Sequence, residues 1–234
     1  MKQYVDRTAR TVTALKEANT ELSEANIRIS AMSKELEEGY QETLHALVSA
    51  LDVRDSEVHG HSQRVVQLSL QIAAQLGIPP ESEAWRDLEH GALLHDVGKI
   101  GVPDAILRKP GELTPEEWQL MRQHPAKGCA MLQQVHFLRG AALIAHCHHE
   151  RYDGTGYPRG LAGEAIPLTA RIFAVADAFD AMTSCRPYRQ PLSVEEACQE
   201  IRRSSGTQFD PQVVEAFRAL PASASDEGSL RQAA

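Results

Sequence analysis

The 234-residue sequence lacks the long apolar segments that membrane proteins carry. No apolar run approaches the roughly 18 residues of a membrane-spanning helix. The N-terminus also lacks the apolar core of a signal peptide. The sequence therefore predicts no membrane span.

Cysteine is scarce, and so is an excess of positive charge. The four cysteines form no CxxC pair, which argues against a disulfide framework and favours a reducing compartment, so we expect a cytoplasmic location. The formal net charge of −8 argues against extended contact with a nucleic-acid polymer. A small anionic substrate is still compatible with this charge, because bound metal ions reverse the local sign.

Residues from about 8 to 38 carry an apolar heptad with no Gly or Pro before Gly39. One heptad position holds Leu15, Leu22, Ile29 and Leu36, and the position three residues later holds Ala18, Ala25 and Met32. The pattern predicts a coiled-coil signalling helix over residues 1–41 that joins two copies of the chain in a homodimer. The alternative is a single amphipathic helix folded back on the rest of the chain.

From residue 42 to residue 220 the apolar spacing is helical throughout, so we predict an all-α domain over these residues. Two capping boxes, Thr114 with Glu117 and Ser193 with Glu196, mark helix starts. No convincing alternating strand appears, although residues 151–168 could hold a short hairpin. The Ala/Ser/Gly-rich residues 221–234 are predicted to be a disordered tail.

The pair His95-Asp96 follows an apolar stretch that we expect to be a buried helix. A buried carboxylate needs a cation or several hydrogen bonds. Successive helix residues point about 100° apart, so His95 and Asp96 can bind a metal cluster from adjacent directions. The alternative is that Asp96 caps the turn before Gly98. Lys99, one helical turn later, supplies a fixed positive charge or is a surface lysine.

A second histidine pair, His148-His149, closes the apolar run 141–145 and enters a glycine-rich loop. A lone histidine at a helix end is more often a surface cap, but that reading explains two adjacent histidines at the start of a glycine-rich loop less well. His124 precedes Pro125, so we expect the backbone there to turn out of the helix and aim the imidazole.

Two further carboxylates are candidate ligands. Asp177 lies at the end of the buried stretch 172–176, and Glu57 lies four residues before His61, on the same face of a helix. The remaining histidines are predicted to be structural or exposed: His45, His59, His90, His136 and His146. Mixed histidine and carboxylate ligands without thiolates suit iron or manganese better than a structural zinc site.

These residues belong to a series of motifs in a fixed order. The series runs through Gly60-His61-Ser62, His95-Asp96-Val97-Gly98-Lys99, His124-Pro125, His148-His149-Glu150-Arg151-Tyr152-Asp153-Gly154, Gly156-Tyr157-Pro158, Val175-Ala176-Asp177-Ala178-Phe179-Asp180-Ala181-Met182-Thr183, Arg186-Pro187-Tyr188-Arg189 and Gln208-Phe209-Asp210-Pro211. Over roughly residues 42–218 the chain resembles the HD-GYP family, a branch of the HD phosphohydrolases.

The resemblance implies an all-helical HD-domain bundle that hydrolyses cyclic di-GMP to pGpG, and in some members on to GMP. It implies two or three divalent metal ions, usually iron or manganese, with Asp96 bridging two of them. The implied metal ligands are Glu57, His61, His95, Asp96, His124, His148, His149 and Asp177. Glu57 would serve a third ion, although Gly60 stands one position later here than in the family's three-metal pattern.

We expect two-metal phosphodiester hydrolysis with Lys99 and Asp96 as the catalytic residues. Lys99 would also contact the substrate, stabilising developing charge or assisting the leaving 3′ oxygen. Arg186 and Arg189, three residues apart, would bind its second phosphate through bidentate contacts, or form a salt-bridged surface turn. The glycine-rich loop 152–163 resembles a loop that contacts signalling protein partners in the family. The alternatives are an HD phosphohydrolase of another cyclic dinucleotide, and a non-catalytic cyclic di-GMP sensor or adaptor.

Overall fold

The computed structural model describes residues 1–55, 60–185 and 190–221. Throughout these residues the regular elements are helices, with isolated bridges and no β-strand, so the all-α prediction is confirmed. Contacts divide the chain into two compact units, residues 1–46 and residues 47–234. None of the helices in the described ranges combines the length and the apolar character needed to cross a bilayer.

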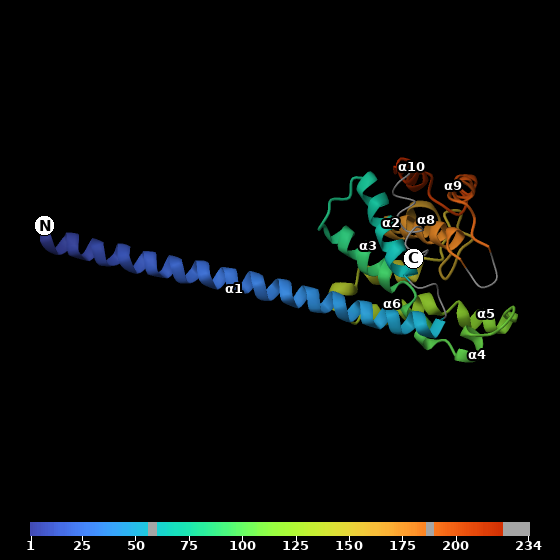
Figure 1. The fold of residues 1–234 in the computed structure, drawn as a ribbon, viewed down its shortest axis with the longest axis horizontal. Coiled ribbons are helices and arrows are strands. Elements are labelled where there is room, and N and C mark those ends of the chain that lie inside the picture. The colour runs from blue at the N-terminus through green and yellow to red at the C-terminus, as the bar shows by residue number, and fades with distance from the viewer. Residues whose placement is uncertain (56–59, 186–189, 222–234) are drawn as a thin grey trace, which may run out of the picture. The chain divides into compact units, whose positions relative to one another are not determined.

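A single helix, α1 (Lys2–Asp55), makes up the first unit and continues into the second (Figure 1). Gly39 does not interrupt the helix. The apolar heptad side chains stay exposed, at 70% for Leu15, 60% for Leu22 and 64% for Ile29. The helix prediction is confirmed, and the pairing of two such helices stays a prediction.

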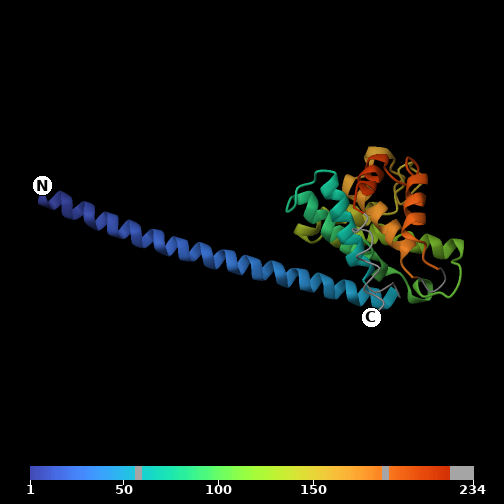
Figure 2. The same cartoon turned by 45° about the horizontal axis from the view of Figure 1, so that its top comes forward.

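The second unit is a bundle of short helices, seen from two directions in Figures 1 and 2. Its elements are α2 (His61–Gln75), α3 (Glu83–Leu94), η1 (Val97–Gly101), α4 (Asp104–Leu107), α5 (Pro115–Met121), α6 (His124–Leu132), η2 (His136–Leu138), α7 (Ala141–Cys147), η3 (Gly163–Ala165), α8 (Leu168–Thr183), α9 (Val194–Arg203) and α10 (Pro211–Arg218). Helix α2 packs against α3 and α8, and α7 packs against α3 and α6. Helices α9 and α10 pack beside α8.

The core of this bundle is built from fully buried aliphatic and aromatic side chains of α2, α3, α7, α8 and α10. Among them are Val65, Ile72, Leu88, Ile144, Phe173 and Val213. Helices α3 and α7 approach closely because Gly91 has no side chain, and a Cβ there would clash with the side chain of Ile144. This close packing places the C-terminal ends of α3 and α7, which carry His95 and His148, in the same region of the bundle.

The predicted helix starts are confirmed at both capping boxes. The Thr114 hydroxyl accepts from the Glu117 amide, and the Ser193 hydroxyl accepts from the Glu196 amide. In each case the glutamate side chain bonds back to the cap amide, which satisfies a second backbone donor of the first turn.

One local prediction was wrong, and one possibility left open by the sequence is not realised. His124 begins α6 instead of lying outside a helix, because Pro125 falls in the first turn, where its missing N–H costs nothing. Residues 151–168 form no hairpin, since Asp153 and Ala162 make one isolated bridge there. The predicted tail falls almost wholly on residues 222–234, outside the described residues.

Candidate metal centre

Three histidines are fixed by the ends of the helices that precede them. In His95, His124 and His148 the Nδ1 atom bonds a backbone carbonyl three residues earlier, in the last turn of α3, α5 or α7. The acceptors are the oxygens of Ala92 (2.9 Å), Met121 (2.8 Å) and Ala145 (2.8 Å). Carbonyls in the last turn of a helix have no intrahelical donor, so each ring satisfies one of them. A carbonyl only accepts, so Nδ1 carries the proton and Nε2 presents a lone pair.

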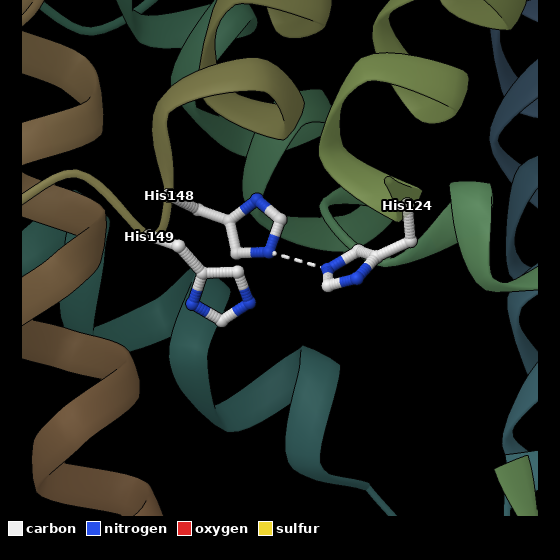
Figure 3. Close-up of side chains that lie close together, drawn as sticks. All are labelled: His124, His148 and His149. Carbon is white, nitrogen blue, oxygen red and sulfur yellow. Dashed lines mark hydrogen bonds between the residues drawn. The ribbon is translucent and has the colours of Figure 1, made fainter. Parts of the chain in front are cut away.

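These Nε2 atoms converge on the carboxylate of Asp96. Oδ2 of Asp96 lies 3.1 Å from Nε2 of His95, and Oδ1 lies 3.2 Å from Nε2 of His124 and 3.6 Å from that of His148. The Nε2 atoms of His124 and His148 are 3.1 Å apart (Figure 3). Lone pairs on neighbouring nitrogens and a carboxylate repel one another unless a cation lies between them. Oδ1 of Asp96 is buried without a hydrogen-bond donor among the described residues, which fits a cation ligand.

The donor atoms fall into two triads on either side of Asp96. His124, His148 and His149 form one, whose ligand atoms all lie within 4.8 Å of each other. His61, His95 and Asp177 form the other, within the same limit. Asp96 contacts a histidine of each triad through a different oxygen. The chemistry and spacing of these donors fit two divalent ions that share Asp96.

The structure therefore brings together seven of the eight predicted ligands: His61, His95, Asp96, His124, His148, His149 and Asp177. The eighth, Glu57, lies outside the described residues, as do Arg186 and Arg189. Of the histidines predicted to be structural, His45 and His136 are exposed, and His90 is buried beside the ring of Phe137. His59 also falls outside the described residues.

Burial keeps two imidazoles of one triad, those of His148 and His149, neutral at physiological pH. Desolvation lowers the pKa of His148 well below its ordinary value, and the neighbouring His149 lowers it further. Desolvation, assisted by the neighbouring His124, lowers the pKa of His149 to about 4. Neutral imidazoles are the form that binds metals. These two rings are therefore ready to accept a cation without first losing a proton.

Asp96 is ionised in the same environment. Burial alone would raise the pKa of its carboxyl, but the charge of Lys99 and the neighbouring His95 hold that pKa well below the ordinary value. The Nζ atom of Lys99 lies 2.7 Å from Oδ2 of Asp96. Lys99 is thus fixed beside the carboxylate that the two triads share, as the sequence predicts for a charge-stabilising residue.

Behind His61 lies a carboxylate, that of Asp180, whose role the motif pattern did not predict. Oδ2 of Asp180 lies 2.7 Å from Nδ1 of His61, and Arg64 binds both oxygens of this carboxylate, at 2.5 and 3.0 Å. The hydrogen bond that Nδ1 of His61 donates to Asp180 turns Nε2 of His61 toward Asp177, 3.4 Å away. The signal was present, because Asp180 follows Asp177 by three residues on one helix and therefore shares its face.

The loop after the second histidine pair folds back onto that pair. The ring of Tyr157 stacks on the ring of His149, with centroids 4.7 Å apart and planes 25° apart. The amide of Tyr157 donates to the carbonyl of His149 at 3.2 Å. Gly156 makes this return possible, because a Cβ there would clash with the backbone of residues 149–151. Tyr157 therefore restrains a candidate ligand.

Glu150 anchors the same loop from inside the protein. Its side chain is only 4% exposed, and its two oxygens accept from the amides of Arg159 (2.8 Å) and Leu161 (3.0 Å). In the sequence, Glu150 and Tyr157 are recognisable only as parts of motifs. Their shared role, to hold the ring of His149 in place, depends on a loop conformation that residue spacing does not reveal.

Comparisons with known proteins identify the family of this chain. The HD domain family matches residues 45–213. The cyclic di-GMP phosphodiesterase of Thermotoga maritima is 48% identical over 189 residues, which cover 80% of this chain and 50% of that protein. The cyclic di-GMP phosphodiesterase response regulator RpfG of Xanthomonas campestris pv. campestris is 45% identical over 192 residues, covering 81% and 50%. The chain thus spans about half the length of these curated relatives.

A solved structure shows the same fold. The crystal structure of a cyclic GMP-AMP specific phosphodiesterase of V. cholerae matches with a TM-score of 0.59 and 26% sequence identity, covering 76% of this chain and 47% of that one. The family match, the curated relatives and the shared motifs all lead to the same assignment. The chain belongs to the HD domain family, in its HD-GYP branch.

Proposed function

We propose that this chain is a metal-dependent phosphodiesterase that hydrolyses cyclic di-GMP to pGpG. The observation that carries the proposal is the pair of triads joined by Asp96, with the ammonium of Lys99 2.7 Å from the shared carboxylate. The curated relatives named above, which are cyclic di-GMP phosphodiesterases, support the choice of substrate.

The metal content that we propose is two divalent ions, iron or manganese, because the donors are imidazole nitrogens and carboxylate oxygens without a thiolate. His124, His148 and His149 would hold one ion, and His61, His95 and Asp177 the other, with Asp96 contributing to both. When bound, such ions lower the pKa of a water nucleophile and neutralise charge on a phosphodiester. A third ion at Glu57 stays a prediction.

The role of Lys99 in this reaction follows from its position. Its ammonium is both a positive charge and a proton donor beside the centre, so it can stabilise charge on the leaving 3′ oxygen. Asp96 keeps this ammonium in place through a charged hydrogen bond. Contacts from Arg186 and Arg189 to the second phosphate are part of the proposal.

The second candidate substrate is a hybrid cyclic dinucleotide. It is favoured by the match to the V. cholerae structure, which is that of a cyclic GMP-AMP specific phosphodiesterase. A non-catalytic sensor is the weaker alternative, because the seven described ligand positions all retain residues that can bind metal. Further cleavage of pGpG to GMP would be a second step of the same chemistry.

The test combines metal analysis with product analysis. Protein purified without oxygen should contain iron or manganese and convert cyclic di-GMP to pGpG, with GMP and hydrolysis of 3′3′-cGAMP followed in parallel. Asp96→Asn should lose metal and activity, whereas His136→Gln, an exposed histidine outside the centre, should keep both. Turnover of 3′3′-cGAMP alone would establish the second candidate. Metal-loaded protein that binds cyclic di-GMP without cleaving it would overturn the enzyme proposal.

The context of the reaction is also part of the proposal. We propose a homodimer paired through residues 1–41, supported by the exposed heptad side chains of α1. A cytoplasmic location is in keeping with the free cysteines of the described residues. A signalling protein that docks on the loop 152–163 is a further proposal, supported by the family resemblance of that loop.

A further inference from the structure

The guanidinium of Arg54, in the last turn of α1, binds the backbone of the short helix η1 that carries Lys99. Its Nη1 donates to the carbonyl oxygens of Lys99 (3.1 Å) and Ile100 (3.0 Å), and its Nη2 donates to that of Val102 (2.7 Å). Its Nε donates to Oδ1 of Asp104 (2.9 Å). A planar fork of five N–H donors lets one arginine serve all four acceptors, which a lysine cannot do.

The helix η1 also rests on α6. A Cβ on Gly98 would clash with the carbonyl of His124 and the amide of Gly128, so the two backbones are in direct contact. The ammonium of Lys127 donates to the carbonyl of Gly101 at 2.9 Å. A 3₁₀ helix has poorer internal hydrogen-bond geometry than an α-helix, so contacts from outside contribute much to its position.

The hydrogen bonds that Arg54 donates to backbone carbonyls contribute more to holding this backbone than its ion pair with Asp104 does. The side chain of Asp104 is 65% exposed, and exposed ion pairs contribute little. The side chain of Arg54 is 28% exposed, and its loss would leave two η1 carbonyls and that of Val102, directly after η1, without this donor. The backbone so released is the one from which Lys99 extends to reach Asp96.

We propose that Arg54 is a positioning residue for Lys99, which it holds through the carbonyls of residues 99, 100 and 102. The proposal rests on the catalytic role of Lys99 set out above. It makes the last turn of α1 a part of the active-site support, so that unwinding or moving this turn acts on Lys99 through three hydrogen bonds.

Steady-state hydrolysis of cyclic di-GMP by the manganese-loaded full chain tests the effect. Arg54→Ala should lower kcat on the order of 10- to 100-fold with little change in KM, because misplacing a catalytic group carries such a penalty. Arg54→Lys, which keeps the charge without the fork, should fall between the wild type and Arg54→Ala. Asp104→Ala is the matched control, because it removes only the exposed ion pair, and it should stay near the wild type.

A double mutant separates positioning from general damage. In a Lys99→Met background, Arg54→Ala should cost little further activity, since the two residues act as one unit. An equal loss in both backgrounds would overturn the proposal.

Hydrogen exchange in the metal-free protein provides a readout that needs no turnover. The amides of Lys99 and Val102 bond to the carbonyls of Asp96 (2.9 Å) and Lys99 (3.0 Å), and both should exchange faster in Arg54→Ala than in Asp104→Ala. Unchanged exchange at these amides would overturn the proposal. If Arg54→Ala does not fold, the exchange rates of these amides in Arg54→Lys are compared with those in Asp104→Ala instead. A wild type that hydrolyses no cyclic dinucleotide would contradict the proposed function and leave the exchange result standing.

Discussion

At the scale of single residues, the charge of Lys99 is the group whose contribution can be isolated most cleanly. It lies beside the shared carboxylate but is not a metal ligand, so substitution should affect the reaction without emptying the centre. We predict that Lys99→Met lowers kcat on the order of 100- to 1,000-fold, as for other groups that stabilise transition-state charge. The metal content should stay that of the wild type.

The matched control is Lys109→Met. Lys109 pairs with Glu117 at 2.5 Å and belongs to neither triad, so this variant should keep the wild-type kcat. Metal analysis and initial rates on the same samples check both statements. A Lys99→Met protein with unchanged kcat would contradict the role of Lys99.

The neutral histidines predict a dependence of stability on pH. The pKa of His149 is lowered to about 4, and that of His148 is also lowered, whereas the unfolded chain titrates near the ordinary 6.5. As the pH falls from about 6.5 to about 4, the unfolded state therefore binds more protons than the folded state. The metal-free protein should lose stability across this window, with His149 contributing up to about 3 kcal/mol.

Urea denaturation at pH 7 and pH 5 measures this loss. The variant His149→Gln, which cannot titrate, should show a shallower dependence than the wild type. At His95 the nearby Asp96 outweighs desolvation and raises the pKa, so protonation of His95 stabilises the folded protein as the pH falls. His149→Gln should therefore keep a dependence of stability on pH that has the opposite sign. Parallel curves for the wild type and His149→Gln would contradict the assignment to His149.

The sequence predicted the candidate ligands that the structure brings together, but it did not predict the residues that support them. Ligand residues are recognisable because His and Asp at fixed motif positions have few other reasons to follow buried stretches. Asp180 acts on the candidate ligand His61 through one hydrogen bond. Glu150 acts on the candidate ligand His149 through the folded loop that it anchors. Such contacts join residues far apart in the chain, as His61 and Asp180 are, and depend on packing that residue order does not specify.

At the scale of elements, the centre is assembled from helix ends, the middle of α8 and one returning loop. The loop predicts a further effect, because Tyr157 restrains the ring of His149 without binding metal itself. Tyr157→Leu should weaken metal binding roughly 10- to 100-fold, the usual effect of losing a group that orients a ligand. Competition with a chelator dye measures the affinity directly.

Tyr152→Leu serves as the control for this substitution. Tyr152 lies in the same loop, where its amide donates to the carbonyl of Gln208, a bond that survives the change of side chain. Its metal affinity should stay near that of the wild type. Equal affinities for Tyr157→Leu and the wild type would show that the stacked ring does not orient His149.

Helix boundaries were predictable where a side chain at the N-cap position accepts a hydrogen bond from a backbone amide of the first turn. Thr114 and Ser193 do so with their own hydroxyls, and both starts are confirmed. His124 was misplaced because proline excludes a helix interior but not a helix start, and the residue order alone did not separate the two cases. The close approach of α3 to α7 at Gly91 could not be predicted, since it depends on which faces meet.

At the scale of the whole molecule, the predicted homodimer depends on α1. Aspartate at two of the exposed heptad positions should bury charge in the predicted seam and abolish pairing. We therefore expect the double variant Leu22→Asp, Ile29→Asp to be monomeric by sedimentation equilibrium, and deletion of residues 1–41 to have the same effect.

The control variant places an aspartate outside the predicted interface between the two helices. Ser30→Asp lies outside the two apolar heptad positions and should remain a dimer. A wild-type chain that sediments as a monomer would disprove the predicted pairing.

The all-α class itself was predictable, because the apolar residues repeat with helical spacing throughout. The relation between two copies was not, since a heptad specifies a seam between helices and not the arrangement of the domains attached to them.

The three imidazole protons that bond the helix-end carbonyls have a practical consequence for spectroscopy. His95, His124 and His148 are only 3%, 2% and 5% exposed, respectively, so their Nδ1 protons are shielded from solvent. Protons in such bonds exchange slowly. They should give separate downfield resonances in a proton NMR spectrum, and those resonances would shift or broaden as ions enter. Metal occupancy could thus be followed one ligand at a time.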